Sequence, residues 1–230
     1  MWKLMLAGLG AGAAFTLFTR RASANPSSLP PSASPSPIKP VQFKIGSKVD
    51  ANQGGTIVTL EIPDESEWVE LEHEGKRYLV APRAIGPFRI GEAVKLAAMK
   101  GWVVPTRALS DAIWQAADLK VMPRPMAHDG TPKTMFSQDT IARHKAFVEK
   151  QIDGRDFKLL SGDHKDIVVE HGKAGIYGWH VAEGDALKLG IPTYTPVTKG
   201  LGARIVQPWP SPHDDAWGDY SQYLHPVKEL

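Results

Sequence analysis

Hydrophobic and polar positions along the chain follow three successive patterns. Alternation of apolar and polar residues predicts a strand in residues 55–63 and a hairpin in 68–82 that turns at Glu74-Gly75. Apolar residues at helical spacing then predict three helices: residues 90–101, a segment capped at its start by Thr106, and residues 137–152. Alternation returns after residue 154. It predicts further strands at Lys165–Val169, Gly175–His180, 193–197 and 203–207.

The order of these elements indicates the fold class. Helices grouped between two β-rich parts favour an α+β fold over an alternating parallel sheet. We expect one domain over residues 42–230, with a β-rich N-terminal part, central helices, and a β-hairpin followed by a turn-rich C-terminal part.

The helix at 137–152 contains a histidine that could be mistaken for a ligand. Its apolar stripe is expected to hold Ile141, Val148 and Ile152, with the stem of Lys145 between them. His144 is expected to be a partly exposed helix residue, because histidine usually keeps contact with the surface.

The first 24 residues resemble a targeting segment. A basic residue and an apolar run at 4–18 precede the small residues Ala22 and Ala24, which is typical of a cleaved secretory signal. The run is shorter than the ~20 residues that span a bilayer. Two arginines follow the run, and an uncleaved inner-membrane anchor is therefore the alternative.

Proline and serine dominate residues 25–41. Such a segment has little to bury and is expected to be an extended, disordered linker. With the segment before it, the linker predicts a domain that is secreted or periplasmic, or is anchored to the inner membrane by residues 4–18.

Composition excludes several classes of function. The chain has 27 basic and 25 acidic residues among 230, a net charge of +2, and no basic stripe with interleaved aromatics, so nucleic-acid binding is not expected. It contains no cysteine, which excludes Cys nucleophiles, Cys-ligated zinc, iron–sulfur clusters and disulfides. Glycine-rich dinucleotide and phosphate loops, the H-E-x-x-H zinc motif and the G-x-S-x-G nucleophile motif are also absent.

Side chains able to do acid–base or metal chemistry concentrate in the second half of the chain. They occur in five segments bounded by glycine and proline: 163–166, 179–180, 207–209, 213–215 and 218–221. Loops held by a rigid scaffold often carry function. Each residue also has a structural explanation, as a hydrogen-bonded histidine, a surface ion pair or a core aromatic.

For hydrolysis, His180 is the candidate acid or base, because histidine titrates near neutral pH. Asp166 or Asp219 would orient or activate it, and Ser221 or a metal-bound water would attack the substrate. The candidate zinc ligands are His164, His180, His213 and Asp219, although no two of them have a diagnostic ligand spacing. The candidate substrate-binding residues are Trp179, Trp209 and Tyr220.

Several spaced motifs resemble an uncharacterised family of exported bacterial and phage-associated proteins. The matching stretches are GWVVPTRALSDAIWQAADLKVMPRP (101–125), GDHKDIV (162–168), IYGWH (176–180), His213 and DYS (219–221). The resemblance implies a shared fold and a shared site around Lys165, Asp166, His180, His213 and Asp219, and it implies little about the reaction. Where that family has histidine after D-Y-S, this chain has Gln222, and His225 or His164 would have to replace the missing ring.

Two functions from different classes follow. The first is an envelope hydrolase that cleaves an amide or glycosidic bond in peptidoglycan or a related cell-surface polymer. The second is a non-catalytic envelope or virion component that binds such a polymer or another protein. Convergence of His164, His180, His213 and Asp219 in one cleft favours the enzyme, and scatter of these residues counts against it. The sequence leaves the oligomeric state open.

Overall fold

The computed structural model of the protein describes residues 48–53, 56–126, 131–186, 197–198, 200–208 and 216–230. The predicted targeting segment (1–24), the linker (25–41), Trp209 and His213 lie outside these residues, as does most of the strand expected at 193–197. Within the described part, no helix has both the length and the apolar character needed to cross a bilayer.

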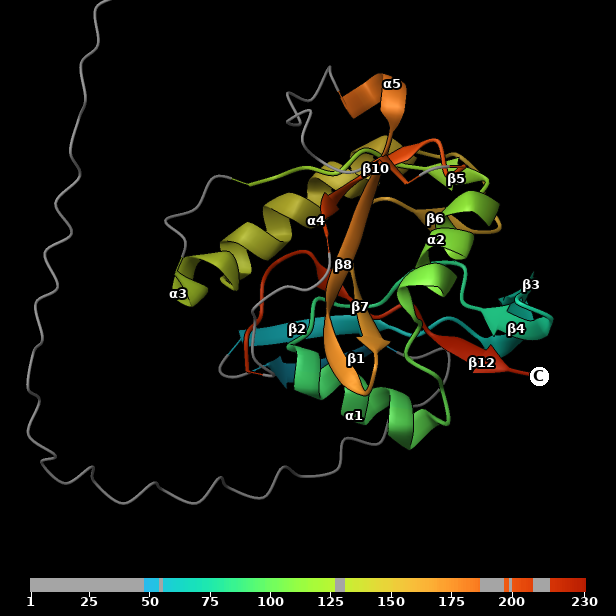
Figure 1. Ribbon diagram of the computed structural model, residues 1–230. Helices are drawn as coiled ribbons and strands as arrows, with labels where there is room; N and C mark the ends of the chain where they lie inside the picture. Colours follow the sequence, from blue (N-terminus) through green and yellow to red (C-terminus); the bar gives the residue numbers. More distant parts are fainter. Residues whose placement is uncertain (1–47, 54–55, 127–130, 187–196, 199, 209–215) are drawn as a thin grey trace, which may run out of the picture. The chain divides into compact units, whose positions relative to one another are not determined.

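The described residues form an α+β body, as the sequence pattern predicts (Figure 1). The first part is β-rich: β1 (Lys48–Gln53), β2 (Thr56–Glu61), the 3-10 turn η1 (Glu65–Glu67), β3 (Val69–His73) and β4 (Lys76–Val80). The middle part holds α1 (Ile90–Lys100), α2 (Arg107–Ala116), the short strand β5 (Leu119–Lys120), α3 (Pro132–Met135) and α4 (Gln138–Ile152). The last part holds β6 (Leu160–Ser161), β7 (Lys165–Glu170), β8 (Lys173–Ala182), α5 (Glu183–Ala186), β9 (Val197–Thr198), β10 (Ala203–Gln207), β11 (Gln222–Tyr223) and β12 (Val227–Glu229).

Local sequence sets the helix ends. Thr106 Oγ1 accepts a hydrogen bond of 3.2 Å from the Leu109 backbone N–H, and Ser137 Oγ accepts one of 3.2 Å from Thr140 N–H. Each side chain satisfies a backbone donor that the first helical turn leaves free. Gly101 ends α1 with φ +67, a left-handed conformation that glycine adopts without steric cost. These three ends confirm the sequence-based expectation.

The buried face of α4 differs from the expectation. His144 is 1% exposed and lies on the buried stripe with Ile141 and Val148, whereas Lys145 is exposed. The spacing of three and then four residues from Ile141 to His144 to Val148 is helical, so the apolar stripe continues through the histidine. The expectation of a partly exposed His144 was therefore wrong.

The β7–β8 hairpin lies at the centre of the body (Figure 1). Its five-stranded sheet has the order β11-β7-β8-β10-β9, in which β11 pairs with β7 in parallel and Gln222 is opposite Lys165. Further along the chain, β12 pairs with β4, and Val227 is opposite Val80. The C-terminal segment thereby joins the hairpin to the N-terminal strands and brings residues 219–225 against residues 163–166 along β7.

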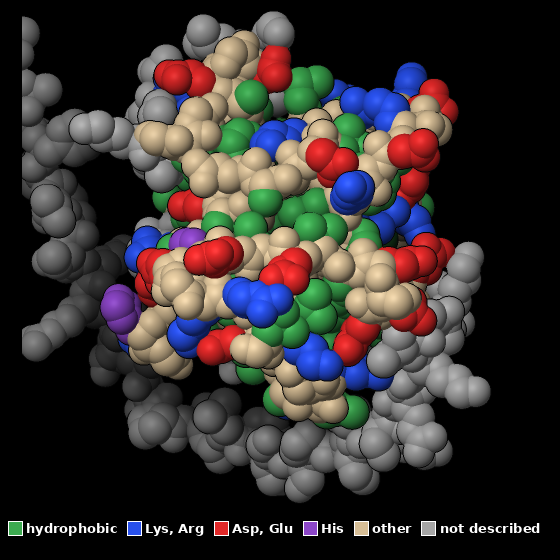
Figure 2. All heavy atoms as spheres, turned by 90° about the vertical axis from the view of Figure 1, so that its right-hand side faces the viewer, with side chains coloured by type: hydrophobic (Ala, Val, Ile, Leu, Met, Phe, Trp, Pro, Cys, Tyr) green, Lys and Arg blue, Asp and Glu red, His purple; other side chains and the backbone are tan. Residues whose placement is uncertain are grey.

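The surface over β3, β4 and β12 carries mixed charge. Figure 2 views the body from this side, and basic and acidic side chains are interspersed across it. Ion pairs link neighbouring strands, such as Arg77 with Glu70 at 2.5 Å and Lys76 with Glu229 at 2.9 Å. Exposed pairs of this kind contribute about 0–1 kcal/mol each to stability.

Candidate functional site

The start of β7 separates the Asp-His-Lys-Asp cluster into two groups. Side chains alternate along a strand, so His164 and Asp166 point to one face and Lys165 points to the other. On the first face, Ser110 of α2 donates a 2.5 Å hydrogen bond to Asp166. On the second face, the Lys165 ammonium contacts Asp219. The cluster therefore supplies two buried polar groups.

The first group is a continuous hydrogen-bonded chain. His164 Nδ1 lies 2.5 Å from Asp163 Oδ1, and His164 Nε2 lies 2.8 Å from Asp166 Oδ1. Asp166 Oδ2 accepts from Ser110. Asp163, His164, Asp166 and Ser110 are all at most 4% exposed. Because buried charges are costly unless paired, the chain is expected to be held in one arrangement.

Charge pairing controls the protonation of this chain. Burial lowers the pKa of His164, but the charges of Asp163 and Asp166 outweigh it and raise the pKa to about 10. Burial raises the pKa of both carboxyls, yet His164 brings each below its ordinary value. In this arrangement, His164 is an imidazolium between two carboxylates.

His225 completes a group of possible metal ligands. Its Nε2 donates a 2.9 Å hydrogen bond to the Ala81 carbonyl, which leaves Nδ1 as the atom with a free lone pair. His225 is 0% exposed, and Nδ1 has no hydrogen-bond partner among the described residues. Donor atoms of His164, Asp166 and His225 lie within 4.8 Å of one another. This buried cluster could hold a metal ion.

His180, on β8, lies near Asp166 across Gly178 but hydrogen-bonds another carboxylate, that of Asp111. Its Nε2 donates to Asp111 Oδ1 at 2.7 Å, and the Tyr177 hydroxyl donates to the same oxygen at 2.9 Å. The His180 ring stacks on Trp114, with 5.7 Å between centroids and 19° between planes. Asp111 and Trp114 both belong to α2, so that helix fixes the ring on two sides.

Gly178 allows His180 and Asp166 to come close. A Cβ at this position would lie 3.0 Å from His180 Cε1 and 3.3 Å from Asp166 Oδ2. Gly178 has φ +94 and the next residue, Trp179, has φ +54. A positive φ at tryptophan is unfavourable and is seen where surrounding structure enforces it, commonly beside functional sites.

The second group contains Lys165, Asp219 and Ser221. Asp219 Oδ1 accepts from the Ser221 backbone N–H at 2.7 Å and from the Ser221 hydroxyl at 2.8 Å. The Lys165 ammonium lies 5.5 Å from the centroid of the Trp179 ring. The Ser221 hydroxyl is thus bonded to a carboxylate, and no hydrogen bond joins it to His180 in the described part of the chain.

The residues predicted from sequence divide among these places. Of the four candidate zinc ligands, His164 belongs to the metal-competent cluster, His180 bonds Asp111, Asp219 bonds Lys165 and Ser221, and His213 lies outside the described residues. Trp179 and Tyr220 are 5% and 2% exposed and pack around His144, which leaves little of either ring for a substrate. Trp209 lies outside the described residues.

Sequence reasoning missed Ser110 and Asp111 as site residues. Both lie on α2, about 55–70 residues before the partners that they contact. A signal was present, since Ser110 and Asp111 lie within the stretch 101–125 on which the family resemblance rests. His225 was considered only as a replacement for a missing histidine, and the structure places it in the cluster.

Comparison of the chain with protein-family models, with curated proteins and with solved structures finds no match in any of the three. The chemistry of the site is therefore argued from its own geometry.

Proposed function

We propose that this protein is a zinc-dependent hydrolase of peptidoglycan or a related cell-surface polymer, exported or tethered to the membrane by its N-terminal segment. The observation that carries the proposal is the orientation of His225. Metal-binding histidines characteristically donate their other ring N–H to a carbonyl or carboxylate, and His225 does so to Ala81. Its Nδ1 is buried and unpartnered among the described residues, beside an imidazole and a carboxylate.

The donor set suits zinc. Two imidazoles and one carboxylate are a common set in catalytic zinc sites, where a fourth position is left for water or substrate. Donor atoms of the three side chains lie within 4.8 Å of one another, and His164 Nε2 would have to give up its proton and its hydrogen bond to Asp166 before it could bind the metal. A bound zinc ion would supply Lewis-acid activation of water at that open position. Asp163 would then accept from His164 Nδ1 and fix the ring orientation.

His180 is placed to act as the acid or base. The carboxylate of Asp111 accepts from Nε2–H, which leaves Nδ1 free to hold or release a proton. That atom and Asp166 Oδ2 both lie against Gly178, where an added Cβ would be 3.1 Å from the first and 3.3 Å from the second. Asp111 and Trp114 orient the ring. His180 would therefore transfer a proton from a fixed position near the proposed ligands.

The polymer and the compartment are supported by the sequence. An apolar N-terminal run followed by a proline- and serine-rich linker is the organisation of an exported or tethered domain. A hydrolase in that position meets the polymers of the cell surface.

The test is release of new amine or reducing ends from purified cell wall by the full-length chain. We expect release that stops with a chelator and returns with zinc. The His180→Ala variant should lose it, while His171→Asn, a change at the exposed turn between β7 and β8, should keep it. Release that persists in His180→Ala contradicts the assigned mechanism.

One observation favours a non-catalytic binding role instead. The polar residues of the site are nearly all buried and mainly bond one another, as expected of a network that fixes a fold. If the chain binds cell wall without releasing any product, and substitution of His180 leaves binding unchanged, this second function replaces the first.

A further inference from the structure

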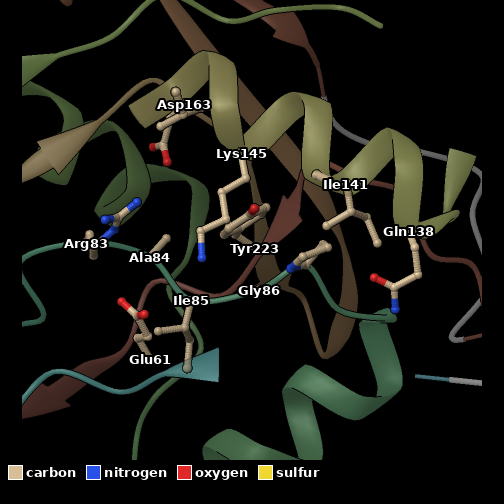
Figure 3. Close-up of a pocket in the computed structure, with 13 residues that line it drawn as sticks. Glu61, Arg83, Ala84, Ile85, Gly86, Gln138, Ile141, Lys145, Asp163 and Tyr223 are labelled. Atoms are coloured by element: carbon tan, nitrogen blue, oxygen red, sulfur yellow. The ribbon is translucent and has the colours of Figure 1, made fainter. Parts of the chain in front are cut away.

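A small hollow lies between α4, the end of β2 and residues 83–87 (Figure 3). Its volume is about 240 Å³, below the ~300–1,000 Å³ of pockets that enclose a whole drug-sized ligand. The hollow therefore suits one small residue or group rather than a stretch of glycan chain. Asp163, the first member of the buried chain that leads to His164, lines it.

The lining of the hollow combines buried apolar side chains with charged and polar ones. Its buried apolar residues are Ala84, Ile85, Pro87, Ile141 and Val148, with the half-buried ring of Tyr223 beside them. Arg83, Lys145, Gln138 and Glu61 supply the polar rim. In Figure 3 the Lys145 side chain extends from α4 into the hollow, on the side that also holds Arg83 and Asp163.

The hollow is lined by two basic side chains, Lys145 and Arg83, and by two acidic ones, Glu61 and Asp163. Lys145 has no ion pair with any described residue. Asp163 Oδ1 lies 2.5 Å from His164 Nδ1 and is therefore already engaged in a hydrogen bond. Arg83 pairs with Glu149 through Nη2 at 2.9 Å, which leaves its other guanidinium nitrogen atoms for a further acceptor. An arginine and a lysine at one rim are suited to a carboxylate.

We propose that this hollow binds the carboxyl-terminal residue of a peptide with a small apolar side chain. The carboxylate meets Lys145 and Arg83, and the side chain lies on Ile85, Ile141 and Val148. The choice of a cell-surface polymer rests on the proposed function. Within such a polymer, the hollow favours the peptide part over the glycan, and therefore cleavage of an amide bond. The hollow also places that peptide end next to Asp163, which bonds the proposed zinc ligand His164.

The experiment measures binding alone, by calorimetry on the purified full-length chain. The probes are N-acetyl-alanyl-alanine with a free carboxylate and the same dipeptide with a carboxyl-terminal amide. Each is used in an L,L and a D,D form, because peptides of either handedness share the carboxylate and the methyl group. Lys145→Gln is the test variant, and Lys150→Gln, an exposed lysine on α4 that does not line the hollow, is its matched control.

We expect the free carboxylate to bind at least tenfold more tightly than the amide, in one or both stereochemical forms. Lys145→Gln should bring the two affinities to within about threefold, and Lys150→Gln should leave the ratio unchanged. Equal binding of carboxylate and amide by the wild-type chain, or a ratio that survives in Lys145→Gln, overturns the inference. Binding without cleavage of cell wall would instead remove the proposed hydrolase and leave this site standing.

Discussion

Two histidines of this protein are buried equally and behave in opposite ways. His144 and His164 are 1% and 2% exposed. His164 lies between two carboxylates, and its pKa is raised to about 10. His144 lies against the rings of Trp179 and Tyr220, with neither ring nitrogen hydrogen-bonded to a described residue, and burial lowers its pKa to about 4. Burial alone does not set the charge of a histidine; its partners do.

The same comparison separates a structural region from a candidate functional one. His144 packs among aromatic rings and makes no hydrogen bond with any described residue. His164 connects Asp163, at the hollow, to Asp166, beside His180 and His225. Buried titratable groups with strong, specific partners are more common at functional sites than in ordinary cores.

The largest effect is expected when the network around His164 is broken. Replacing His164 with leucine leaves Asp163 and Asp166 buried without their shared positive partner, and we expect the free energy of unfolding to fall by about 3–5 kcal/mol. Urea unfolding at neutral pH measures this change. A loss below about 1 kcal/mol would mean that the two carboxylates do not depend on His164, and the comparison would fail.

A smaller effect is expected from the titration of His144. Its folded pKa of about 4 lies below the unfolded value of 6.5, so between these values the unfolded chain binds more protons and stability falls as pH falls. The contribution of His144 is fully present above pH 6.5 and is lost toward pH 4, with a slope of up to about 1.4 kcal/mol per pH unit. Between pH 7 and 5, the unfolding free energy of wild type should fall more steeply than that of His144→Leu, by up to this slope. Parallel pH profiles would contradict a neutral, buried His144.

The smallest effect is expected when His144 itself is replaced at neutral pH. Leucine has a similar volume and removes two buried polar atoms that have no described partner, so the unfolding free energy of His144→Leu should stay within about 1 kcal/mol of wild type or rise. Urea unfolding of His144→Leu and of His164→Leu under the same conditions compares one substitution at the two histidines. Equal, large losses at both positions would show that packing volume, not charge pairing, distinguishes the two sites.

The sequence predicts local features well because local chemistry determines them. Thr106, Ser137 and Gly101 end helices through their own side chains or backbone freedom, and the turn at Glu74-Gly75 is set by its own residues. The site depends instead on tertiary packing. Nothing local to α2 indicates that Ser110 meets Asp166 or that Asp111 meets His180, since the packing of α2 on β7 and β8 creates both contacts.

Strand geometry explains the other differences between the site predicted from the sequence and the site in the structure. The Asp-His-Lys-Asp run looks like one group in the sequence, but alternation places His164 and Lys165 on opposite faces of β7. His225 joins the first face because residues 222–223 pair with β7 in parallel and the chain then passes Ala81. Residue types alone could therefore indicate a His/Asp site without identifying the three side chains that converge.

Zinc binding by the purified full-length chain tests the central claim most directly. Calorimetry and elemental analysis should give one zinc ion per chain in wild type and in the control His171→Asn. In His225→Asn, affinity should fall by more than the ~10–100-fold that loss of an outer-shell partner costs. A wild-type chain that binds no zinc, or one whose affinity is the same in His225→Asn, would contradict the assignment of His164, Asp166 and His225 as a metal site.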